Sequence, residues 1–146
     1  MPVRQYASFV LSGPSTSAER MAAFLDLAPD ETAGPPAGAT HRWKAVCRES
    51  DLTVDEQIAR ILERLRPRAA RIAELAGRLR AEGGGAALEV VRFFGAAGPA
   101  GGPSLFGWAL DPEVLRFLLD TGADLDVDEH DLLAGAPPDP IGYGLR

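Results

Sequence analysis

Four side chains near the C-terminal end of the sequence alternate in a way that could bind a metal ion. Asp124, Asp126, Asp128 and His130 are each separated by one residue, and a regular β-strand would project them from the same face. Carboxylate oxygens together with an imidazole nitrogen suit Mg²⁺ or Mn²⁺. The alternative is a solvated strand face whose charges protect a sheet edge from pairing with another chain.

An EF-hand calcium loop does not fit this segment. The three aspartates match only the start of such a loop, which continues with a glycine and ends with a glutamate at its twelfth position. Glu129 and Gly135 occupy those two positions here. We therefore expect no bound metal and no cofactor, and the four side chains above are the candidate ligands if an ion does bind.

The single cysteine does not form a convincing catalytic pair. Cys47 and His41 have the same strand parity, but six residues of strand separate them by ~20 Å, which is too far for proton transfer. Cys47 also shares its face with Trp43, which predicts a buried, inert thiol. The glycine-rich segments 83–85 and 95–102 lack the lysine and the strand–helix context of phosphate-binding loops.

Charge is concentrated at the C-terminal end. The net charge is −6, and residues 111–146 hold nine acidic against two basic residues, a local net of −7. Non-specific nucleic-acid binding needs a basic footprint, which this chain lacks. The negative field would instead steer a basic protein partner. Arginines at helical spacing between positions 60 and 71 could dock an acidic partner, or form a solvent face with neighbouring acids. The candidate partner-binding residues are Asp124, Asp126, Asp128, Asp131, Arg60 and Arg64.

Length and composition predict a single globular domain. The chain has 146 residues, of which 25% are charged and 46% apolar, as is usual for a globular protein. We expect one domain over residues 1–133 and a disordered tail over 134–146, where prolines and glycines gather. One cysteine, no signal-peptide pattern and no membrane-length apolar run favour a cytoplasmic location. The oligomeric state is left open.

Hydrophobic periodicity and turn residues predict the secondary structure. Thr16 and Thr53 each precede a glutamate by three residues, the capping-box pattern that begins a helix. The second helix would run to about residue 81 with a break near Pro67. A further helix should begin at Asp111 and end at Gly122. Strands are expected at residues 5–12, 41–49, 88–94, 104–110 and 124–128.

These elements predict an α+β fold with a mainly antiparallel sheet packed against helices. Segments 5–28 and 104–121 share a strand–turn–helix order, which suggests two related halves and admits a ferredoxin-like arrangement. Opposite charges across strands stabilise a sheet. The acidic strand could therefore lie against the basic positions of strand 41–49. The expected core comprises Phe9, Trp43, Val91, Leu115 and Leu118. The basic set comprises Arg42, Lys44 and Arg48.

Core and turn residues across positions 5–131 resemble the bacterial family called domain of unknown function 4279. The opening YASFVLSG is similar to the family's first strand, and a loop glycine before Trp43 to its glycine-rich turn. The family usually has an aliphatic residue and a tyrosine where this chain has Glu129 and His130. The remaining matches are Leu25, Leu27, Pro29, Gly34 or Gly38, Leu62, Leu65, Pro67, Leu110, Asp111, Pro112, Glu113, Leu118, Gly122, Leu125 and Asp128.

The resemblance implies an α+β domain of the bacterial cytosol without an assigned activity. Some relatives lie near toxin–immunity loci. This association and the acidic C-terminal field favour a non-catalytic module that binds another protein, for example as its immunity or regulatory partner. The alternative is a small-molecule-binding or metal-dependent enzyme that uses the acidic face of the last strand.

Overall fold

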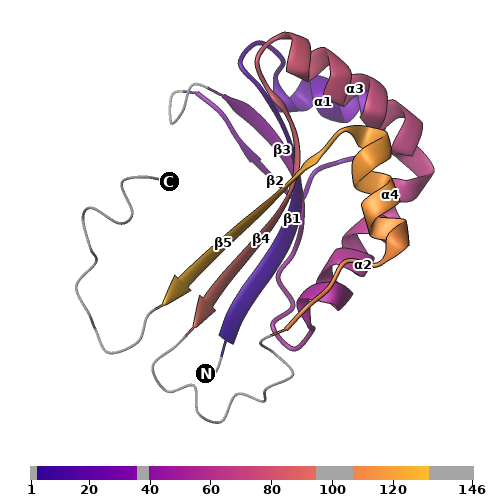
Figure 1. The fold of residues 1–146 in the computed structure, drawn as a ribbon. Coiled ribbons are helices and arrows are strands. Elements are labelled where there is room, and N and C mark those ends of the chain that lie inside the picture. Colours follow the sequence, from indigo (N-terminus) through magenta and orange to yellow (C-terminus); the bar gives the residue numbers. More distant parts are fainter. Residues whose placement is uncertain (1–2, 36–39, 95–106, 132–146) are drawn as a thin grey trace.

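The protein folds into one twisted sheet with its helices on a single face, in a computed structural model that describes residues 3–35, 40–94 and 107–131 (Figure 1). The five strands lie in the order β2-β3-β1-β4-β5. Neighbouring strands are antiparallel except β4 and β5, which are parallel. The α+β class and the mainly antiparallel sheet are therefore confirmed. The elements are β1 (Val3–Gly13), α1 (Ala18–Leu25), β2 (Glu31–Ala33), β3 (His41–Cys47), α2 (Val54–Leu65), the 3₁₀ turn η1 (Arg66–Arg68), α3 (Ala69–Ala81), β4 (Gly85–Phe94), α4 (Pro112–Thr121) and β5 (Asp124–Asp131).

The centre of the sheet is β1, which is paired on both sides. Its residues Phe9 and Leu11 are fully buried beneath the helices. Val10 points to the other face and is also buried, because neighbouring strands flank it. On β3, Trp43 is fully buried, and its indole nitrogen donates a hydrogen bond to the Leu27 carbonyl at 3.2 Å. The predicted inward face of this strand, which includes Cys47, is confirmed.

The long helical segment breaks at Pro67, as predicted. Helix α2 starts with the expected capping box, in which Thr53 and Glu56 bond to each other's backbone. It ends at Leu65, and the 3₁₀ turn that contains Pro67 joins it to α3. Proline lacks the backbone N–H that a continuous α-helix needs at this position. The two shorter helices can both lie on the sheet, where one straight helix would project beyond it.

Helix α1 begins one residue later than the capping pattern predicted. Its N-cap is Ser17, whose side chain accepts a hydrogen bond from the Arg20 backbone N–H at 3.2 Å. The Thr16 hydroxyl instead donates to Glu82 at 2.9 Å. Glu82 also accepts the backbone N–H groups of Ser15 and Thr16, so the end of α3 holds the turn before α1.

The buried face of α4 differs from the predicted one. Val114, Phe117 and Leu118 pack inward, and the Phe117 ring meets Phe9 edge-to-face at 5.6 Å between centroids. Leu115 is 51% exposed, so its assignment to the core is wrong. Successive residues of an α-helix are rotated by about 100°. Leu115 is therefore turned away from the direction in which Val114, Phe117 and Leu118 point. Of the other expected core residues, Phe9, Trp43 and Leu118 are buried, and Val91 is half-buried on the uncovered face.

Two predictions about strands are also corrected. The short strand β2 lies in a segment for which the sequence predicted no strand, and it pairs with β3 through Thr32 and Trp43. Residues 107–110, expected at the end of a strand, form none; Trp108 and Leu110 pack against the core from an irregular segment. The proposed second half therefore lacks its strand over those residues. Residues 95–106 and the tail at 134–146 lie outside the described part of the chain.

Candidate functional site

The last strand forms an exposed margin of the sheet. Strand β5 pairs with β4 on one side, and no other described strand pairs with its outer edge. None of its eight residues is buried. An edge strand of this kind presents unpaired N–H and C=O groups to its surroundings.

Carboxylates line the face of β5 that none of the described helices covers. The register places Asp124, Asp126 and Asp128 beside Ala87, Glu89 and Val91 of β4, and residues paired in register share a face. Glu89 thus lies directly beside Asp126, which puts two like charges in neighbouring positions. Like-charged neighbours across strands destabilise a sheet, so this row is an unfavourable feature that the fold itself maintains.

The far end of the same face carries a small aromatic group. The rings of His130 and Phe93 stack with centroids 4.8 Å apart, and the Arg4 guanidinium lies 5.5 Å from the Phe93 centroid. His130 Nε2 is 3.2 Å from Asp128 Oδ2. In the described part of the chain, no group of three or more His, Cys, Asp or Glu side chains is arranged to hold a metal ion.

Apolar side chains occupy the other side of the same margin. Leu125 and Val127 are in register with Leu88 and Val90 on the helix-covered face, yet they remain 43% and 37% exposed. The outer flank of α4 adds Leu115, which is 51% exposed, and Leu119, which is 80% exposed. We call β5 together with Leu115 and Leu119 the β5 edge surface.

The position of α4 explains why its two leucines belong to this surface. Glu113 pairs with Arg66 at 2.9 Å, so its side of α4 faces the end of α2. Leu115 lies about 200° around the helix from Glu113, and Leu119 lies one turn beyond Leu115 on the same flank. Helix α2 packs over β1 and β3. The flank turned away from α2 is therefore the one on the β5 side (Figure 1).

A buried arginine anchors the strand near its C-terminal end. Arg92 of β4 has a side chain only 2% exposed, and it forms an ion pair with Glu129 of β5 at 3.3 Å. Its Nε donates to Gln5 Oε1 at 3.3 Å, and its guanidinium lies 4.8 Å from the Phe94 centroid. Strand β5 is thus exposed along its length, but the ion pair between Glu129 and the buried Arg92 attaches it to the core.

The predicted basic face does not lie beside the acidic strand. Strands β3 and β5 are separated by β1 and β4, a distance of roughly 14 Å at the usual strand spacing. The idea that Arg42, Lys44 and Arg48 pair with the aspartates within the sheet is therefore wrong. Arg48 instead binds Glu31 at 2.8 Å, and this hydrogen bond lowers the pKa of that glutamate.

The predicted arginines of α2 are occupied elsewhere in the fold. Arg60 binds Glu49 at 2.8 Å and Arg64 binds Asp30 at 2.7 Å. Their partners come from the loops beside β2 and β3 rather than from the acids of α2 itself. Because α2 packs over β1 and β3, the structure does not bring these arginines together with the β5 aspartates.

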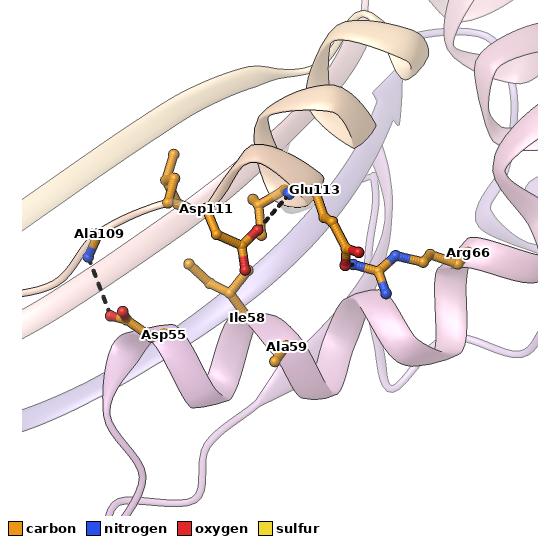
Figure 2. A pocket seen from close by; sticks show the side chains of 9 residues that line it. Asp55, Ile58, Ala59, Arg66, Ala109, Asp111 and Glu113 are labelled. Carbon is orange, nitrogen blue, oxygen red and sulfur yellow. Dashed lines mark hydrogen bonds and ion pairs between the residues drawn. The ribbon is translucent and has the colours of Figure 1, made fainter.

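A groove of about 260 Å³ separates α2 from the segment before α4 (Figure 2). Its three carboxylates already have partners within the chain. Asp55 accepts the Ala109 N–H at 3.3 Å, and Asp111 accepts the Val114 N–H at 2.9 Å as the cap of α4. Glu113 completes the set through Arg66. Asp55 and Glu113 attach the α4 segment to α2 and to the turn η1, whereas Asp111 caps α4 itself.

Two of these features were not predicted from the sequence. Glu89 is 37 positions from Asp126, and only the pairing of β4 with β5 makes them neighbours. The exposed flank of α4 was also missed, because Leu115, which lies on it, was expected in the core. Phe117 is the residue that should have shifted the buried face.

In the described residues, the geometry defines a two-layer α+β domain whose helices cover one face of the sheet and whose last strand forms an acidic, partly apolar edge. The chain belongs to the family described as domain of unknown function (DUF4279), whose model matches residues 3–132. The family resemblance drawn from core and turn residues is thereby confirmed. No curated protein and no solved structure matches the chain. Among the described helices, none has the length and apolar character needed to cross a bilayer.

Proposed function

We propose that this domain is a non-catalytic protein-binding module that recruits a basic partner through the β5 edge surface. The observation that carries the proposal is the carboxylate row, in which Glu89 and Asp126 are neighbours beside an unpaired edge of the described sheet. A basic partner would remove the repulsion within this row. Complementary charges would also accelerate association.

The alternative predicted from the sequence is an enzyme that uses the acidic face of β5, and the groove in Figure 2 is a second place where carboxylates gather. Its carboxylates Asp55, Asp111 and Glu113 each bind a group of the same chain, which gives them a structural task. By contrast, Asp124 and Asp126 form no side-chain hydrogen bond or ion pair with another described residue. This difference favours binding by the strand over catalysis in the groove.

An immunity or regulatory role in a bacterial cytoplasm is compatible with such a module. That setting derives from the family resemblance and from the charge pattern. The acidic edge of the sheet is the reason to expect a positively charged partner. It does not identify that partner.

Capture of partners with charge variants tests the proposal. Asp124→Asn with Asp126→Asn should lose basic proteins that the wild type retains at low salt. The matched control is Asp51→Asn with Glu63→Gln, which removes the same charge from exposed positions outside β5. For a recovered partner, the β5 variant should slow association more than it speeds dissociation. An association rate that does not change with ionic strength would contradict electrostatic recruitment.

A further inference from the structure

From the two-sided character of the β5 edge surface we infer its mode of recognition. It is a strand-addition site for an extended segment of another protein, in which basic residues alternate with apolar ones. The inference rests on the proposed function and specifies its partner. The segment would lie along the outer edge of β5 as a further strand of the sheet.

The backbone of β5 supplies the first requirement. Its outer edge is unpaired among the described residues, and Asp124–Asp131 spans roughly 26 Å in extended form. An added strand would pair with the outward N–H and C=O groups of this edge. The contact with Arg92 holds the strand in place from the inner side.

The side chains of β5 supply the second requirement, since an added strand shares its two faces. On the uncovered face, the partner's side chains would meet Asp124 and Asp126, with Glu89 one strand further in. On the helix side they would meet Leu125 and Val127, and Leu119 is the most exposed apolar side chain on the flank of α4 turned away from α2. Because successive residues of a strand point to opposite faces, the partner needs basic and apolar residues in alternation.

Charge also distinguishes a basic partner from a second copy of this chain. Two copies could pair their β5 strands antiparallel with both helix layers on the same side of the joined sheet. Asp126 of one copy would then lie opposite an acidic residue of the other, for example Asp126 or Asp128. Such a row would add to the repulsion that Asp126 already has with Glu89. A basic strand removes it, and the exposed leucines are covered in either case.

Two peptides of equal composition provide the test. One contains four Arg-Val repeats and the other four arginines followed by four valines, both with blocked ends. The binding constants are measured by fluorescence anisotropy against the full chain. Backbone amide exchange of β5 is measured by NMR, and the self-association of the protein by sedimentation. We expect the alternating peptide to bind at least tenfold more tightly and to slow amide exchange in β5.

Two variants test the two faces separately. Asp124→Asn with Asp126→Asn should weaken the alternating peptide, and so should Leu119→Ala, by up to about tenfold if the side chain becomes covered. Leu119 is 80% exposed, so its truncation leaves the core intact. The control Leu27→Ala lies beside β3, away from the β5 edge surface, and at matched folding it should bind like the wild type.

The possible failures separate this inference from the proposed function. Equal binding of both peptides that depends on Asp124 and Asp126 would overturn strand addition and leave a basic-protein module. The same holds if neither peptide binds while partner capture still depends on those aspartates. Loss of aspartate dependence in both experiments would overturn both proposals. Dimerisation at micromolar concentration with protection of β5 would show that the occupant is a second copy.

Discussion

Neutralising Asp126 should stabilise the free protein, although it removes part of the proposed binding surface. In the folded chain Asp126 is the register partner of Glu89, and both are aligned on the uncovered face. Asp124 and Asp128 are also near, but they are two residues away in sequence and stay close in the unfolded chain. Only the repulsion from Glu89 is specific to the folded state, and Asp126→Asn would relieve it.

The size of the effect follows from the strand spacing. Two unit charges about 5 Å apart in water repel by roughly 0.8 kcal/mol before screening. With a screening length of ~8 Å at physiological ionic strength, the repulsion falls to roughly 0.4 kcal/mol. It should rise to ~0.7 kcal/mol at 0.01 M salt and fall to ~0.2 kcal/mol at 1 M. The predicted gain in unfolding free energy for Asp126→Asn follows these three values.

A double-mutant cycle measures this term directly. Urea unfolding is recorded for the wild type, Asp126→Asn, Glu89→Gln and the double variant at the three salt concentrations. The coupling between the two positions should be repulsive and should shrink as salt rises. Asp120→Asn paired with Glu89→Gln is the control, since Asp120 is an exposed residue of α4 and should show no coupling. Destabilisation by Asp126→Asn at low salt, or a cycle without coupling, would refute the arrangement of the carboxylate row.

Further predictions concern the core, a helix cap, pH and metal ions. Leu118→Ala should reduce the unfolding free energy by about 2–5 kcal/mol because the side chain is buried, whereas a loss below 1 kcal/mol would place Leu118 at the surface. Asp111→Ala should cost about 1 kcal/mol by removing the cap of α4, as measured by urea unfolding against Asp111→Asn. Backbone N–H groups lower the pKa of Glu82 below its usual value of 4.5, so its stabilisation is present above that pH and is lost as pH falls through the lowered pKa; stability should therefore fall more steeply below pH 4.5 in the wild type than in Glu82→Gln. Millimolar Mg²⁺ or Ca²⁺ should raise the melting temperature no further than salt of equal ionic strength, and a saturable rise abolished by Asp126→Asn with Asp128→Asn would establish an ion site.

Local signals predicted those parts of the fold that local chemistry determines. The cap at Asp111, the left-handed Gly122 with φ 69° and the capping box at Thr53 each depend on residues a few positions apart. The break at Pro67 depends on a missing backbone donor at one position. Such features can be identified without knowing the rest of the chain.

The errors arose where a distant residue decides between local alternatives. Thr16 and Ser17 can both cap α1, and the choice is made by Glu82, which lies 66 positions from Thr16 and binds its hydroxyl group. Strand β2 is three residues long and is held by pairing to β3, so it has little pattern of its own.

The candidate site was predictable in its composition but not in its surroundings. Alternation at period two predicted that the aspartates of 124–128 share one face, and the register places them so. Which strand lies beside them depends on the strand order, which periodicity does not contain. The basic strand β3 was expected there, and β4 with Glu89 occupies the place instead.

The absence of buried residues in β5 has a consequence for how proteins with this fold can diverge. A strand whose side chains are all outside the core is free from the packing constraints that limit substitutions elsewhere in a sheet. Its backbone position is specified by pairing with β4 and by the contact of Arg92 with Glu129. The outward residues could therefore be replaced one after another, and a new partner accepted, while the domain beneath keeps its stability. In this fold, the surface that would discriminate between partners can evolve separately from the core that maintains it.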